Sequence, residues 1–141
     1  RLRDEGLVDW IGFSGHGATE VQLAGIEHEG DGGFDFVNLH WYYTFQAHTP
    51  VLEAARRRNL GVLVISPNDK GGWWHTPPAR LERLCRPLSP MVFNLLFCLA
   101  RPEIHTLSIG AARPEDLDLY PRILRDRRRL RQALHQVDDR L

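Results

Sequence analysis

One loop near the middle of the chain combines polar groups with glycines in a way that suits an anion. It follows the apolar run 62–65 and contains a serine, an amide, a carboxylate, an ammonium group and two glycines (Ser66, Asn68, Asp69, Lys70, Gly71 and Gly72). Glycine lets the backbone approach a ligand closely, and free N–H groups beside a cation favour phosphate. The alternative is an ordinary strand-to-helix turn with solvated side chains. The loop alone leaves these two interpretations level.

A second loop of the same kind lies near the C-terminal end. Small residues at 110–112 lead into Arg113, which immediately precedes Pro114, the predicted first residue of a helix. Arg113 would then be the N-cap, where arginine accepts no hydrogen bond and opposes the helix dipole. A bound phosphate would reverse both objections. The alternative is a surface ion pair of Arg113 with Glu115 or Asp116. Because both loops share the pattern, we predict one phosphate site built from both, with Gly110 in its wall.

Two other kinds of site are also conceivable. A metal-dependent hydrolase would use residues near the predicted strand ends, namely His16, His40, Asp69 and His75. The sequence has no H-x-H or H-E-x-x-H spacing, which disfavours this site. A nucleic-acid-binding helix would use the basic cluster Arg122, Arg125, Arg127, Arg128, Arg129 and Arg131. However, apolar residues at Leu130, Leu134, Val137 and Leu141 predict a packed amphipathic helix whose arginines face solvent.

The elements that would position these residues alternate along the chain. Apolar runs predict strands at 7–13, 34–39, 62–65 and 105–109. Helices are predicted at 19–28, 50–59, 79–86 and 91–100 and from 114 onward, with Thr19, Thr49 and Ser89 as N-caps. Four strand–helix units predict an α/β fold with a parallel sheet. A doubly wound sheet and part of a (β/α)8 TIM barrel both fit, but no G-x-G-x-x-G turn supports the former.

Composition narrows the class of protein. The 141 residues are 43% hydrophobic and 26% charged with formal net charge +0, so no bulk attraction to nucleic acid or anionic membranes is expected. No apolar run approaches the roughly 20 residues of a membrane span. Cys85 and Cys98 fit buried thiols in a reducing cytoplasm. A complete barrel needs about 250 residues, and the chain starts at Arg1, so we expect residues 1–141 to be a single partial domain, the second half of a barrel.

Four motifs in order resemble the aldo/keto reductases. Residues 11–14 (IGFS) are similar to the fifth strand of that family, and 64–67 with 70–72 to its seventh strand and loop. Residues 107–111 with 114–117 resemble the eighth strand and the helix after it. The runs 36–43 and 69–72 look like a divergent bacterial branch, and the resemblance extends to about Tyr120. It implies metal-free reduction of aldehydes or ketones by hydride transfer from NADPH.

The resemblance also implies roles for individual residues. Ser14 matches the serine that hydrogen-bonds the nicotinamide carboxamide, and Gly15 replaces an asparagine, which leaves open whether His16 takes that contact. A family glutamine falls near Asn38 or Leu39. The pyrophosphate would lie at Ser66, Asn68 and Lys70, and the adenosine phosphate at Gly110 and Arg113.

In many members of the family an aromatic side chain stacks on the nicotinamide. The matching position in this sequence is Ile65, which is a further departure from the family pattern. Trp41 or Trp73 is therefore expected to reach the substrate side from a loop, although packing in the core is the alternative for a tryptophan. The catalytic tetrad would lie in a missing N-terminal half of the barrel, so this piece alone is expected to be inactive.

Overall fold

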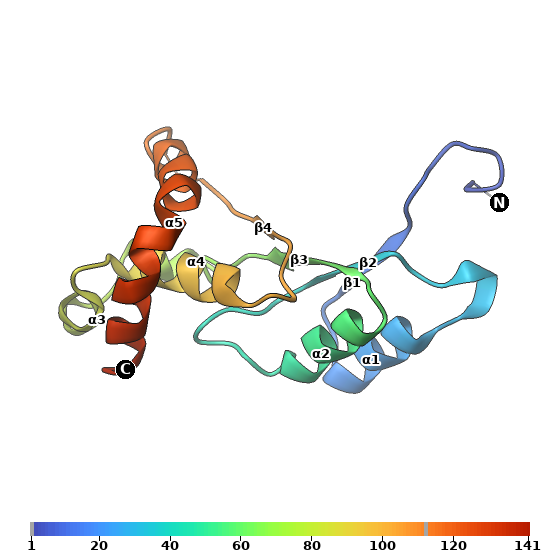
Figure 1. Ribbon diagram of the computed structural model, residues 1–141, viewed down its shortest axis with the longest axis horizontal. Coiled ribbons are helices and arrows are strands. Elements are labelled where there is room, and N and C mark those ends of the chain that lie inside the picture. Colours follow the sequence, from blue (N-terminus) through green and yellow to red (C-terminus); the bar gives the residue numbers. More distant parts are fainter. Residues whose placement is uncertain (1, 112) are drawn as a thin grey trace.

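The computed structural model describes residues 2–111 and 113–141, and it forms a four-stranded parallel sheet with helices between the strands (Figure 1). The strands are β1 (Gly12–Gly15), β2 (Phe36–Leu39), β3 (Gly61–Ile65) and β4 (Thr106–Ser108). The helices are α1 (Thr19–Glu27), α2 (Thr49–Arg57), α3 (Ala79–Cys85), α4 (Pro90–Ala100) and α5 (Asp116–Asp138), with short 3-10 turns η1 (Gly30–Gly32) and η2 (Trp73–His75). The predicted alternation of four parallel strands with helices is confirmed.

The strands lie side by side in the order in which they occur along the chain, β1-β2-β3-β4. In register, Ser14 of β1 is opposite Asn38 of β2, and Asn38 is opposite Leu63 of β3. A doubly wound sheet instead reverses its strand order partway. All four carboxyl ends meet at one edge because every pair is parallel, so the loops after the strands are brought together there.

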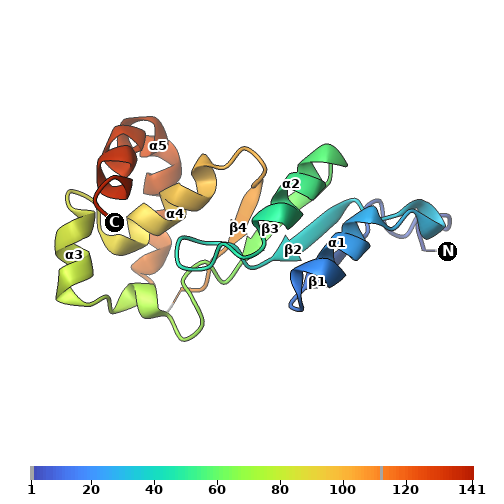
Figure 2. The ribbon, with the colours of Figure 1, turned by 90° about the horizontal axis from the view of Figure 1, so that it is seen from below.

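The two faces of the sheet differ in burial because side chains alternate along a strand. Val37, Leu39, Val62 and Val64 are completely or almost completely buried in a core with α1 and α2. Figures 1 and 2 show these two helices on the same side of the strands. The opposite face carries Ser14, Asn38 and other side chains that stay partly exposed.

A second core lies among α3, α4 and α5, and α4 joins it to the first. Cys98 belongs to the sheet core, Phe93 to the helical core, and Phe97 packs against both. The prediction that the helix around 91–100 is buried is therefore confirmed. Cys85 and Cys98 are buried free thiols. In the described residues, no helix is both long and apolar enough to cross a bilayer.

The first strand is shorter than predicted. It begins at Gly12 rather than at residue 7, because Phe36, the first residue of β2, pairs with Gly12. Just before the ladder, the Ile11 N–H donates to the Asp35 carboxylate at 2.8 Å. Leu7 and Trp10 are 67% and 72% exposed, so these apolar side chains ahead of Gly12 lie outside the core.

Only one of the three predicted helix caps has the expected side-chain bond. The Ser89 hydroxyl accepts from the Val92 N–H at 3.3 Å, which confirms that cap. Thr19 and Thr49 are wrong as caps, because each is already the first helical residue. Their hydroxyls connect to neighbouring loops instead, Thr19 donating to the Ala47 carbonyl at 3.4 Å and Thr49 to the Gln46 carbonyl at 2.7 Å.

Candidate functional site

A chain of hydrogen bonds connects the ends of β1 and β2 at the carboxyl edge. Ser14 Oγ lies 3.2 Å from His16 Nε2, and His16 Nδ1 lies 3.2 Å from His40 Nε2. Ser14 and His16 are exposed, whereas His40 is 8% exposed. The parallel pairing of β1 with β2 causes this meeting, because it places the residues that follow each strand next to one another.

The electrostatic surroundings keep His40 neutral at pH 7. Burial lowers the pKa of His40 below its usual 6.5, and the nearby groups His16, Lys70 and His48 lower this pKa further. The Ile65 carbonyl acts in the opposite direction. Lys70 therefore lies close enough for its charge to act on His40, although it comes from the loop after β3.

Asn38 lies next to Ser14 in the sheet, as their register shows. Its Oδ1 is buried and has no hydrogen-bond partner among the described residues. Buried polar atoms are normally paired, so such an atom needs an explanation. Three of the residues predicted for the nicotinamide end of the site, Ser14, His16 and Asn38, are thus brought together.

The loop after β3 has an unusual backbone. Ser66 and Asp69 have φ values of 51° and 64°, and two glycines, Gly71 and Gly72, are also left-handed. Non-glycine residues in this region store strain that persists only where the surroundings fix it. The Asp69 carboxylate supplies such fixation by accepting from the Tyr42 hydroxyl at 3.0 Å and the Lys70 N–H at 2.7 Å. Burial, followed by the Asp69 interaction, raises the pKa of Tyr42 to about 12.

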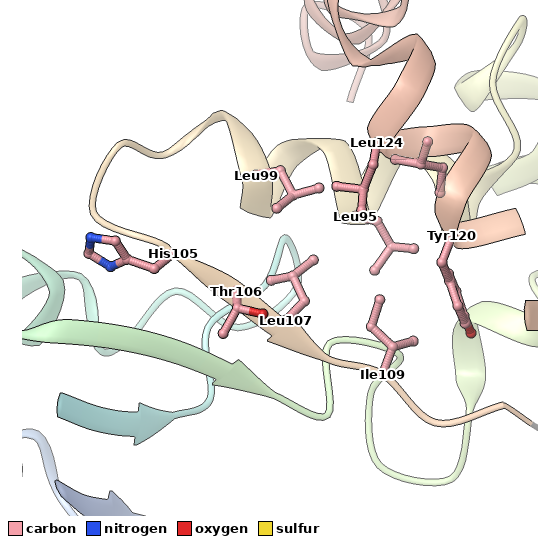
Figure 3. A pocket seen from close by; sticks show the side chains of 9 residues that line it. Leu95, Leu99, His105, Thr106, Leu107, Ile109, Tyr120 and Leu124 are labelled. Atoms are coloured by element: carbon pink, nitrogen blue, oxygen red, sulfur yellow. The ribbon is translucent and has the colours of Figure 1, made fainter. Parts of the chain in front are cut away.

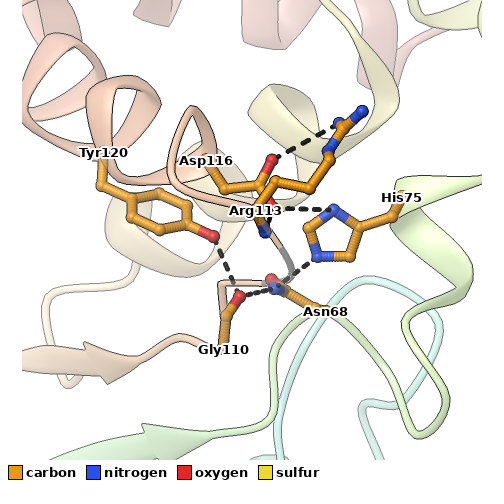
Figure 4. A network of polar contacts seen from close by, with 6 residues as sticks. All are labelled: Asn68, His75, Gly110, Arg113, Asp116 and Tyr120. Atoms are coloured by element: carbon orange, nitrogen blue, oxygen red, sulfur yellow. Dashed lines mark hydrogen bonds and ion pairs between the residues drawn. The ribbon is translucent and has the colours of Figure 1, made fainter.

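A polar network ties this loop to the loop after β4 (Figure 4). Asn68 Nδ2 donates to the Gly110 carbonyl at 2.9 Å and lies 3.2 Å from His75 Nε2. The Tyr120 hydroxyl donates to the same carbonyl at 3.1 Å. Asn68 is 6% exposed, so its amide fastens the two loops to one another rather than facing outward. Ser66 and Lys70, in contrast, are exposed.

Arg113 is not the N-cap of the last helix. Helix α5 begins at Asp116, with Glu115 in the cap position, and Ala112 lies outside the described residues. The Asp116 carboxylate accepts from the Arg113 backbone N–H at 3.0 Å and lies 3.6 Å from its guanidinium. The surface ion pair that the sequence offered as an alternative is therefore formed. The Arg113 side chain is still 71% exposed, and such pairs contribute little, so an anion can compete for it.

The structure gives the two candidate tryptophans different positions. Trp41 is 1% exposed, stacks on Phe97 with ring centroids 5.1 Å apart, and donates to the Thr49 hydroxyl at 3.0 Å. Trp41 is therefore a core residue, because its ring has no surface left for a ligand. Trp73, on turn η2 after β3, is 71% exposed. Its neighbour Trp74 is buried in the helical core.

The residues of the other two conceivable sites are mostly dispersed. Of the four metal candidates, only His16 and His40 meet, while Asp69 bonds Tyr42 and His75 bonds Asn68. Within residues 2–111 and 113–141, no three His, Cys, Asp or Glu side chains form a metal-binding group. On α5, buried Leu134 and Val137 confirm the packed face, and the described arginine side chains on it are exposed (Arg122, Arg125, Arg128 and Arg131).

A separate apolar cavity of about 370 Å³ lies between β4, α4 and α5. Figure 3 shows Leu95, Leu99, Leu107, Ile109 and Tyr120 around it. None of the residues predicted for the cofactor or substrate lines this cavity. It is therefore distinct from the carboxyl-edge site.

The sequence did not single out Asn94, a residue of α4 that supports the loops of the site. This side chain is completely buried in α4; it accepts from the Tyr43 N–H at 3.0 Å and donates to the Pro67 carbonyl at 2.7 Å. It thus holds the loops after β2 and β3 in place. A single amide in the otherwise apolar run 91–100 was the available signal, because a buried amide must find partners.

No family model matches the sequence, and no curated protein matches it significantly. Any function proposed for the chain therefore depends on the residues at the carboxyl edge and on the motifs in the sequence.

Proposed function

We propose that this chain is the cofactor-binding part of an NADP(H)-dependent oxidoreductase that reduces aldehydes or ketones. The resemblance of four motifs to aldo/keto reductases leads to this proposal. The observation that carries it is the meeting of Ser14, His16 and Asn38 at the edge where Lys70 and Arg113 also emerge from loops.

In this proposal the sheet is the second half of a (β/α)8 barrel. The sequential parallel order supports it, because barrel strands follow one another in the same way. The outer strands β1 and β4 would pair with a first half, which would also supply the catalytic tetrad. The partly exposed face with Ser14 and Asn38 would then line the barrel interior. This piece alone would bind cofactor without catalysing reduction.

The side chains at the edge fit the two ends of such a cofactor. A carboxamide both donates and accepts hydrogen bonds, and Ser14, His16 and Asn38 offer a hydroxyl, an imidazole and an amide whose Oδ1 has no partner among the described residues. When bound, the nicotinamide supplies the hydride. The phosphates would lie at Ser66, Lys70 and Arg113, which are exposed.

Three further positions complete the proposed site. A Cβ added at Gly110 would meet no atom within 4 Å, so the backbone there is open to a ligand. Asn68 would hold the loops in shape, and Trp73 would face the carbonyl substrate.

The test is NADPH and NADH binding, measured by calorimetry on this chain and on the longer protein that includes the first half. Lys70→Ala should weaken both cofactors several-fold, because both contain the pyrophosphate. Arg113→Ala should weaken NADPH several-fold more than NADH, because only NADPH carries the additional adenosine phosphate. Arg125→Ala, at an exposed arginine on α5, is the matched control and should change neither. Absence of saturable NADPH binding to the longer protein would refute the proposal.

A further inference from the structure

Lys70 is the only lysine in the sequence, whereas every other Lys or Arg position holds arginine. Its side chain is exposed in the loop after β3, and its ammonium group has no ion-pair partner among the residues that the structure describes. A lysine ammonium is a compact charge that suits phosphate oxygens. The neighbouring Asp69 carries the opposite charge, so the contacts of Asp69 explain why the two side chains stay apart.

The carboxylate of Asp69 is held by two other donors. Its Oδ1 atom accepts from the Tyr42 hydroxyl at 3.0 Å and from the Lys70 backbone N–H at 2.7 Å. Hydrogen bonds to a carboxylate are charge-assisted and stronger than bonds between neutral groups. Together these bonds fix the carboxylate between the loops after β2 and β3, at the backbone of Lys70 rather than at its ammonium group.

Tyr42 is the rigid partner in this contact. Its side chain is 5% exposed, and its backbone pairs with Phe45 through two hydrogen bonds of 3.0 and 2.8 Å. Asp69, in contrast, lies in a loop and has a left-handed backbone with φ of 64°. A non-glycine residue keeps this conformation only where its surroundings fix it. The buried tyrosine therefore holds the loop carboxylate, and not the reverse.

We propose that Tyr42 is a positioning residue that, by holding the Asp69 carboxylate, keeps the Lys70 ammonium free to bind a diphosphate group. Without the Tyr42 hydroxyl, the carboxylate can turn toward the ammonium group and compete with the bound anion. The assignment of the diphosphate to NADP(H) rests on the proposed function, whereas the arrangement of Tyr42, Asp69 and Lys70 does not.

The test uses inorganic pyrophosphate as the probe and NMR of the 13C-lysine-labelled chain as the readout. Because Lys70 is the only lysine, its side-chain Cε signal reports on this one group. The signal should move in a saturable way when the unsubstituted chain is titrated. Tyr42→Phe should weaken pyrophosphate binding roughly 2- to 10-fold, the range that corresponds to one hydrogen bond.

A double-mutant cycle with Asp69 separates this role from support of the loop shape. The substitution Asp69→Asn keeps an acceptor for the Tyr42 hydroxyl and tolerates a left-handed backbone, but it removes the charge that could pair with Lys70. Asp69→Asn alone should bind pyrophosphate at least as tightly as the unsubstituted chain. In the Asp69→Asn background, Tyr42→Phe should therefore cost no affinity.

Tyr43→Phe is the matched control for Tyr42→Phe. The Tyr43 hydroxyl has no hydrogen-bond partner in the described part of the chain, so its removal should leave pyrophosphate binding unchanged. An equal loss from Tyr42→Phe in both Asp69 backgrounds would overturn the inference, because Tyr42 would then support only the shape of the loop. No response of the Lys70 signal to pyrophosphate in the unsubstituted chain would overturn it as well.

The possible results also separate the inference from the proposed function. Pyrophosphate binding with the expected cycle, but without NADPH binding to the longer protein, would support the role of Tyr42 and refute the cofactor assignment. NADPH binding that Tyr42→Phe leaves unchanged would overturn the role of Tyr42 and leave the cofactor assignment in place.

Discussion

Replacing Asn94 tests whether one buried amide holds the loops at the carboxyl edge. Its two hydrogen bonds, to the Tyr43 N–H and the Pro67 carbonyl, join α4 to the loops after β2 and β3. Asn94→Leu conserves most of the side-chain volume, so the loss of polar contacts dominates over the creation of a cavity. Both backbone partners then stay buried without a bond.

The expected cost follows from these two contacts. Each lost bond contributes about 0.5–1.5 kcal/mol, and a buried group left unpaired adds about 1–3 kcal/mol. Because these contributions overlap, we expect the free energy of unfolding to fall by about 2–4 kcal/mol. With a urea m-value of about 2 kcal/mol/M, the midpoint followed by circular dichroism should fall by about 1–2 M.

A matched control is Gln132→Leu, which removes an exposed amide from a helix surface on α5. Surface substitutions of this kind usually change stability by less than about 0.5 kcal/mol. If Asn94→Leu unfolded at the same urea concentration as this control, the amide would not be bridging the two loops. The account of how the site is supported would then be wrong.

Three further predictions concern protonation, thiol reactivity and assembly. Burial lowers the pKa of His48 below 6.5, so below about pH 6.5 the unfolded state binds more protons than the folded state, and the free energy of unfolding decreases as the pH is lowered. His48→Gln should flatten that dependence in urea titrations at pH 5–7.5. Burial raises the pKa of Cys98 to about 12, so iodoacetamide should label Cys98 on the order of a thousandfold more slowly in the native chain than in urea, and equal rates would contradict its burial. The 141-residue chain alone should self-associate through its two outer strands, and a monodisperse monomer with cooperative melting would contradict the half-barrel proposal.

The sequence by itself determined the kind and order of the elements. The β-branched run at 62–65, the apolar stretch at 91–100 and the Ser89 cap predicted β3, α4 and its start correctly. These features depend on residues within one or two turns or on the alternation along one strand. Side-chain periodicity and local capping therefore suffice to identify them.

The tertiary structure alone decided which polar groups meet and which aromatics are buried. His16 and His40 are 24 residues apart and touch only because β1 pairs with β2 in one register. Trp41 is in the core and Trp73 is exposed, although both follow strands in the sequence. Arg113 lies before the helix rather than at its cap, and its backbone N–H donates a hydrogen bond to the carboxylate of Asp116, the first residue of α5. Contacts of this kind depend on strand register and on neighbours distant in sequence, which local patterns do not encode.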